Sequence, residues 1–76
     1  MPRYYFNLRS DAEEVTDVVG ESCRDEVAAL ALAFDKAGEI ARKRVFGDGW
    51  IGDARIQVED ERARIILTLP VRAAAY

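Results

Sequence analysis

Residues 25–46 read DEVAALALAFDKAGEIARKRVF, and the apolar positions of this stretch recur with the period of an α-helix. We therefore expect one long amphipathic helix here. Ser22 can serve as its N-cap, because a serine oxygen accepts a hydrogen bond from a free backbone N–H of the first turn, and Gly47 follows its end. The stripe expected to face a sheet comprises Val27, Leu30, Ala31, Phe34, Ala37, Gly38, Ala41 and Val45.

Three stretches outside the helix alternate between apolar and polar residues, which is typical of half-buried strands. They are residues 3–9, 53–60 and 63–69. Only residues 60–62 separate the second stretch from the third, so these two predict an antiparallel hairpin, which Pro70 closes. Residues 10–20 are acidic and turn-like, although a short extra strand could form around Val15, Val18 and Val19.

The helix and the strands together predict a single α+β domain over residues 1–76. Its architecture is a two-layer sandwich, in which the amphipathic helix packs on a mainly antiparallel sheet of three or four strands, with the chain order β-(β)-α-β-β. The other face of the sheet is left to solvent or to a partner.

The composition excludes most kinds of catalytic site. The 76 residues carry a formal net charge of −3, one cysteine and no histidine. The chain therefore has no internal disulfide and no histidine base, and its acidic total does not favour nucleic acid or anionic lipid. A chain of this length also has little room to bury a pair of catalytic carboxylates, so we expect no enzyme.

The sequence predicts neither a membrane-spanning segment nor an export signal. No apolar run reaches the roughly 20 residues that cross a bilayer. The first residues lack the apolar core of an export signal. We therefore expect a cytoplasmic protein that does not bind a membrane.

Residues 47–52 spell GDGWIG, which matches G-x-G-x-x-G, the phosphate-binding pattern of dinucleotide sites. The pattern follows the expected helix instead of opening one, so it predicts a helix end and a turn. The acidic residues between positions 11 and 26 lack the spacing of a calcium loop, and Cys23 has no histidine to activate it. We therefore expect no cofactor and no metal.

Two surfaces are candidates for binding a partner. Large apolar residues outside the expected sheet-facing stripe indicate contact with a second copy of the chain, and these are Leu32, Ile40 and Phe46. The outer face of the sheet could instead bind single-stranded RNA or DNA, through stacking on an aromatic ring and phosphate contacts from arginines. The residues of this candidate nucleic-acid face are Arg3, Tyr5, Asn7, Arg55 and Arg64.

Nearly the whole chain resembles a known family of small uncharacterised bacterial proteins with a domain of unknown function. The resemblance rests on the opening residues 2–6, Pro-Arg-Tyr-Tyr-Phe, the turn at residues 17–20, the alanine-rich helix, and the closing hairpin that ends with Leu-Thr-Leu-Pro at residues 67–70. Members of this family commonly begin Pro-Arg-Tyr-Tyr-Phe-His-Leu, and this chain departs from that pattern at Asn7. The resemblance implies no activity, and an amide cannot take over a proton-transfer role from histidine.

These observations favour a noncatalytic interaction module that forms a homo-oligomer, most simply a homodimer, in a bacterial cytoplasm. The alternative is a small RNA- or DNA-binding regulator that uses the open sheet face. The acidic net charge of −3 makes the alternative the less favoured of the two.

Overall fold

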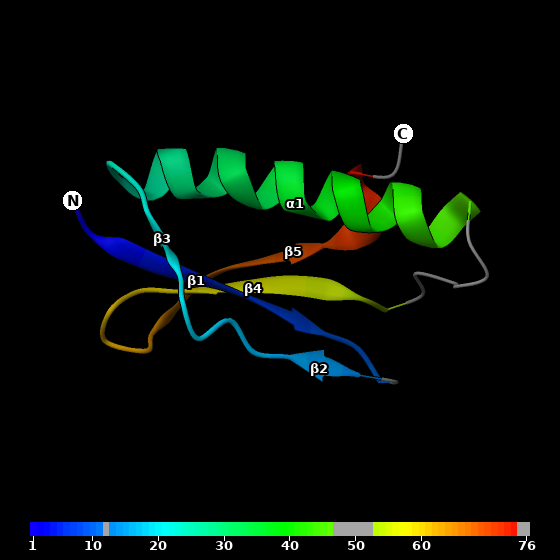
Figure 1. Cartoon of the computed structure of the whole chain (residues 1–76), viewed down its shortest axis with the longest axis horizontal. Helices are drawn as coiled ribbons and strands as arrows, with labels where there is room; N and C mark the ends of the chain where they lie inside the picture. Colours follow the sequence, from blue (N-terminus) through cyan, green and yellow to red (C-terminus); the bar gives the residue numbers. More distant parts are fainter. Residues whose placement is uncertain (12, 47–52, 75–76) are drawn as a thin grey trace.

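The computed structural model describes residues 1–11, 13–46 and 53–74. One helix, α1, lies along an open antiparallel sheet, which confirms the predicted α+β fold (Figure 1). The elements in chain order are β1 (Arg3–Arg9), β2 (Glu14–Val15), β3 (Glu21–Ser22), α1 (Glu26–Phe46), β4 (Arg55–Glu59), β5 (Ile65–Pro70) and the 3-10 helix η1 (Val71–Ala74). The pattern GDGWIG lies outside the described residues, as does Gly47.

The strand order is β2-β1-β4-β5, and β3 also pairs with β1. The predicted hairpin is confirmed, because β4 and β5 are consecutive antiparallel partners. Their register shifts between Val58, which faces Leu67, and Glu59, which faces Ile65. Ile66 is therefore the extra residue of a β-bulge. The extra strand expected around Val15, Val18 and Val19 forms only at Val15, in β2, because Val18 and Val19 lie outside any strand. A second strand of two residues, β3, follows them, and both short strands pair with β1.

Asp17 links the chain to β1 between these two short strands. Its Oδ2 accepts a hydrogen bond from the N–H of Phe6 at 3.1 Å, and its Oδ1 accepts from the N–H groups of Val19 and Gly20 at 3.0 and 2.9 Å. The Asp17 N–H donates to Oδ1 of Asn7 at 2.9 Å. Gly20 has φ +74°, and a Cβ there would lie 2.9 Å from the backbone of β1, so this close approach requires glycine.

Asp25 caps the start of α1, which corrects the prediction for Ser22. Oδ1 of Asp25 accepts a hydrogen bond from the N–H of Ala28 at 2.9 Å, as an N-cap side chain does. Ser22 lies in β3 instead, paired with Arg3 of β1. The sequence could not distinguish the two residues, because both belong to the types that cap helices.

The predicted sheet-facing stripe of α1 is confirmed at Ala37, Gly38 and Ala41, which are buried, but it is wrong in the first half of the helix. Leu30 is 38 % exposed and Phe34 is 44 % exposed, and Val27 is more exposed still. The face that packs on the sheet is a row of alanines at every fourth position, namely Ala29, Ala33, Ala37 and Ala41. Small side chains let the helix backbone lie close to the sheet, so the bulky residues move to the flanks of α1.

Leu32 and Ile40 were expected outside the core, and this placement is also wrong. Both pack against the core cluster as partly buried side chains. The reason is that the alanine row, and not the large residues of the predicted stripe, faces the sheet. The helix is therefore rotated about its axis relative to the prediction, and this rotation turns Leu32 and Ile40 toward the core. The side chain of Phe46 lies outside the described residues.

The alanine face offers a matched test of the helix phase. Ala33→Leu is expected to lower the free energy of unfolding by about 1–3 kcal/mol, because Ala33 is fully buried and extra methyl groups would force the helix away from the sheet. Ala31→Leu, two residues along on the exposed side, is expected to change it by less than about 0.5 kcal/mol. Urea denaturation measures both. Equal losses would contradict the described phase.

Candidate functional site

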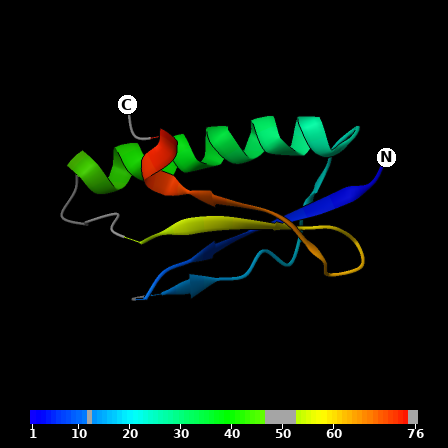
Figure 2. The ribbon, with the colours of Figure 1, turned by 180° about the vertical axis from the view of Figure 1, so that it is seen from behind.

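β5 forms an open edge of the sheet. It stands last in the strand order, and no other strand of the described residues pairs with its outer side. An edge strand presents unpaired N–H and C=O groups that can accept a further strand. Figure 2, the view from behind, shows β5 running beside α1.

Exposed apolar side chains of α1 lie beside this edge. A groove of about 200 Å³ lies between the helix and β5, and all its lining residues except Glu26 are apolar. The other lining residues are Val27, Ala29, Leu30, Val58, Ile66 and Leu67. We name the open edge of β5 together with Val27, Leu30, Phe34, Ile66 and Leu67 the β5–α1 surface.

η1 limits this surface at its other end. The chain turns after Pro70 and η1 packs on α1, where it crosses in front of the helix in Figure 2. Gly38 of α1 is buried beside η1, and a Cβ there would lie 3.9 Å from the carbonyl oxygen of Ala74. Among the side chains of α1 that the structure describes, up to Lys43, the large exposed apolar ones therefore lie in its first half.

A second groove lies on the opposite flank of α1. Its volume is about 480 Å³, and it is lined by Phe6, Leu8, Val15, Thr16, Asp17, Val18, Val19, Lys36, Glu39, Ile40 and Ile56. Nζ of Lys36 lies 5.3 Å from the centroid of the Phe6 ring and 3.9 Å from the Glu21 carboxylate. Ile40, one of the predicted partner contacts, forms part of this wall.

The predicted nucleic-acid face is not assembled as expected. Asn7 is only 1 % exposed, because residues 13–22 run along β1 and Asp17 holds its side-chain oxygen. Asn7 therefore cannot belong to an open face, and its Nδ2 has no hydrogen-bond partner. The Arg3 guanidinium donates to the carbonyl oxygens of Val19 and Gly20 at 3.0 and 3.3 Å.

The other two arginines of that face also have acceptors. Arg55 lies 3.6 Å from the carboxylate of Asp53, and Nε of Arg64 lies 2.8 Å from the carboxylate of Asp60. Exposed ion pairs of this kind are weak and could exchange for phosphate. Arg64 belongs to the turn between β4 and β5, so it lies away from Arg55 at the other end of β4.

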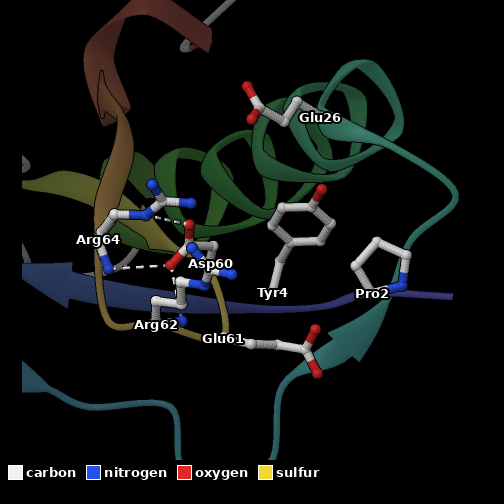
Figure 3. A pocket seen from close by; sticks show the side chains of 7 residues that line it. All are labelled: Pro2, Tyr4, Glu26, Asp60, Glu61, Arg62 and Arg64. Carbon is white, nitrogen blue, oxygen red and sulfur yellow. Dashed lines mark hydrogen bonds and ion pairs between the residues drawn. The ribbon is translucent and has the colours of Figure 1, made fainter.

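A pocket of about 330 Å³ lies beside the start of α1 and was not predicted (Figure 3). It is lined by Pro2, Tyr4, Glu26, Asp60, Glu61, Arg62 and Arg64. Asp60 organises its wall, because it accepts hydrogen bonds from the backbone N–H groups of Arg62 and Arg64 and from Nε of Arg64. The backbone N–H of Arg64 contributes most to holding the pKa of Asp60 below its usual range.

Cys23 is buried, and burial raises the pKa of its thiol, so the thiol is protonated at neutral pH. Within residues 1–11, 13–46 and 53–74, no group of three acidic, cysteine or histidine side chains could hold a metal ion. α1 is long enough but not apolar enough to cross a membrane, and no other helix of the described residues could do so.

Comparison with known proteins identifies one family. The family described as "Domain of unknown function (DUF6894)" matches residues 3–72, from the first residue of β1 into η1. The comparisons with curated proteins and with solved structures gave no match.

Proposed function

The chain belongs to the DUF6894 family, and on that premise we propose that it is a noncatalytic interaction module of the bacterial cytoplasm that forms a homodimer through the β5–α1 surface. The observation that carries the proposal is the open edge of β5 beside the exposed side chains of Leu30 and Phe34. The surface thus offers both unpaired backbone groups and apolar area.

A second copy of the chain suits this surface because an edge strand is complementary to itself. When two identical strands meet antiparallel across a twofold axis, the N–H groups of each face the C=O groups of the other. The two sheets then continue into one. The α1 flanks lie beside the new strand pair and can cover each other's apolar side chains.

The size of the molecule indicates that the helix takes part in the contact. A stable interface buries about 800 Å² on each partner. The chain exposes 5109 Å² in total, so such a contact would use roughly a sixth of its surface. Pairing along the six residues of β5 alone is a narrow contact, and the apolar groove extends it onto Val27, Leu30 and Phe34.

A small RNA- or DNA-binding regulator is the weaker alternative. Binding would need the guanidinium groups of Arg3, Arg55 and Arg64 to leave the oxygens that they already contact. Asn7 is buried and contributes no group to such a face.

The oligomeric state tests the proposal. We expect light scattering coupled to size exclusion to give the mass of two chains at micromolar concentration. Leu30→Glu and Phe34→Glu are each expected to shift the mass to one chain, because an unpaired carboxylate would enter an apolar contact. Circular dichroism should show that both variants stay folded, since both side chains are partly exposed in the single chain.

Val18→Glu is the matched control. Val18 is an exposed valine beside the groove on the opposite flank of α1, so the variant adds the same charge away from β5. It is expected to remain a dimer. A wild-type mass of one chain, or dissociation by Val18→Glu alone, would contradict the proposal.

A further inference from the structure

The pocket beside the start of α1 is lined by the hydroxyl group of Tyr4, which has no hydrogen-bond partner among the described residues. Tyr4 is 6 % exposed, and Figure 3 shows its hydroxyl pointing toward Glu26 between the helix and the turn that follows β4. Among the described residues, no donor or acceptor forms a hydrogen bond with this hydroxyl. The ring of Tyr4 is buried, whereas its hydroxyl is accessible from the pocket and can form a hydrogen bond with a ligand. The pocket therefore presents an unused polar group to whatever enters it.

The surroundings of this hydroxyl are acidic. Burial raises the pKa of Tyr4, and the nearby Glu26, Cys23, Asp25 and Asp60 add to the effect. The phenol stays neutral and its oxygen can accept a hydrogen bond. The carboxylate of Glu26 has no ion-pair partner among the described residues. A positively charged donor, such as an ammonium group, matches these two acceptors.

The side of the pocket formed by the turn after β4 carries two arginines, Arg62 and Arg64, beside Asp60. The guanidinium group of Arg62 has no partner among the described residues, because only its backbone N–H is bonded, to Asp60. Arg64 binds Asp60 through Nε and is otherwise largely exposed, so its remaining N–H groups are available. In Figure 3 both arginines lie on the Asp60 side, whereas Glu26 and Glu61 lie above and below Tyr4. Apart from the Asp60–Arg64 ion pair, the pocket thus has the free guanidinium of Arg62 on one side and the carboxylates of Glu26 and Glu61, which have no partner among the described residues, around Tyr4.

We propose that this pocket binds a small zwitterion, of the class of free amino acids, with its ammonium group against Tyr4 Oη and Glu26 and its carboxylate against Arg62 and Arg64. A volume of about 330 Å³ is sufficient for such a molecule. Guanidinium groups suit a carboxylate, since their N–H donors match its two oxygens. The site lies outside the β5–α1 surface, apart from the shared rim residue Glu26.

Chemical-shift titration of the ¹⁵N-labelled full chain tests the proposal. The probes are glycine, β-alanine and γ-aminobutyrate, which differ in the spacing between ammonium and carboxylate, and ethylammonium and acetate at equal ionic strength. At least one zwitterion is expected to cause saturable shifts at Tyr4, Glu26 and Arg62. The two single-charge probes are expected to bind at least about tenfold more weakly, because each uses only half of the pocket.

Two variants place the binding in the pocket. Tyr4→Phe removes only the hydroxyl, and Arg62→Gln removes only the free guanidinium; each is expected to weaken zwitterion binding about tenfold. Tyr5→Phe and Arg42→Gln, which make the same changes away from the pocket, are expected to leave zwitterion binding unchanged. The spectrum of each variant without added ligand shows whether the variant is folded. Absence of saturable binding by all three zwitterions, unchanged binding by Tyr4→Phe and Arg62→Gln, or equal binding of ethylammonium would overturn the proposal.

Discussion

Ile56→Ala is expected to lower the free energy of unfolding by about 2–5 kcal/mol, which is the usual cost of removing a large aliphatic side chain from a packed core. Ile56 is 2 % exposed in the central strand β4, where it pairs with Leu8 of β1 on one side and with Leu69 of β5 on the other. Its loss leaves a cavity among these strands and the alanine face of α1, and a short chain has few other contacts to compensate.

Ile65→Ala is the matched control, because it makes the same change in the neighbouring strand at a residue that is 53 % exposed. We expect a loss of less than about 1 kcal/mol. Denaturation at one fixed protein concentration measures both variants, since self-association adds to apparent stability. Similar losses in the two would mean that the core does not lie between β4 and α1.

Asp17→Ala is expected to lower the free energy of unfolding by about 2–4 kcal/mol, although Asp17 lies in an irregular segment at the edge of the sheet. The variant removes three hydrogen bonds to a charged acceptor, from the N–H groups of Phe6, Val19 and Gly20. The bond from Phe6 ties the segment between β2 and β3 to β1, where no strand pairing holds it. Without the carboxylate, the N–H of Phe6 loses its acceptor.

The contribution of Asp17 is expected to depend on pH. Burial acts to raise its pKa, but the hydrogen bonds from Gly20, Phe6 and Val19 outweigh burial and hold the pKa below its usual value. Because the pKa is lower in the folded chain than in the unfolded chain, the stabilisation is complete above about pH 4 and is lost as the pH falls through the folded pKa.

The difference in unfolding free energy between wild type and Asp17→Ala should therefore shrink below about pH 4. Asp35→Ala removes an exposed helical aspartate without a partner among the described residues, so it is expected to show no such change. A difference for Asp17→Ala that is constant from neutral to acidic pH would contradict this account.

The elements of the fold follow directly from local patterns in the sequence. Ile56 and Val58 recur at every second position, which predicts β4, and the helical period over residues 25–46 predicts α1. The face of α1 that packs on the sheet does not follow from the local pattern along the whole helix. Large side chains such as Leu30 and Phe34 dominate a periodicity analysis, whereas Ala29 and Ala33 gain their role only from the close approach of a sheet.

The candidate sites depend on features that no local pattern contains. In a β4–β5 hairpin, either strand could pair with β1. Only the pairing of β4 with β1, which the structure shows, leaves β5 at the edge of the sheet. The bulge at Ile66 turns this residue toward α1, although simple alternation predicts the outer face. The pocket around Tyr4 combines the chain start, the first turn of α1 and the turn after β4, which meet only in the folded molecule.

Contacts between two copies of the chain test the proposed homodimer most directly. A sample that mixes ¹³C-labelled and unlabelled chains gives isotope-filtered nuclear Overhauser effects only between different chains. We expect such effects between Leu30 or Phe34 of one copy and α1 or β5 of the other, and they should vanish in Leu30→Glu. A chain that remains single across the micromolar range, or effects confined to the flank around Val18, would contradict the account.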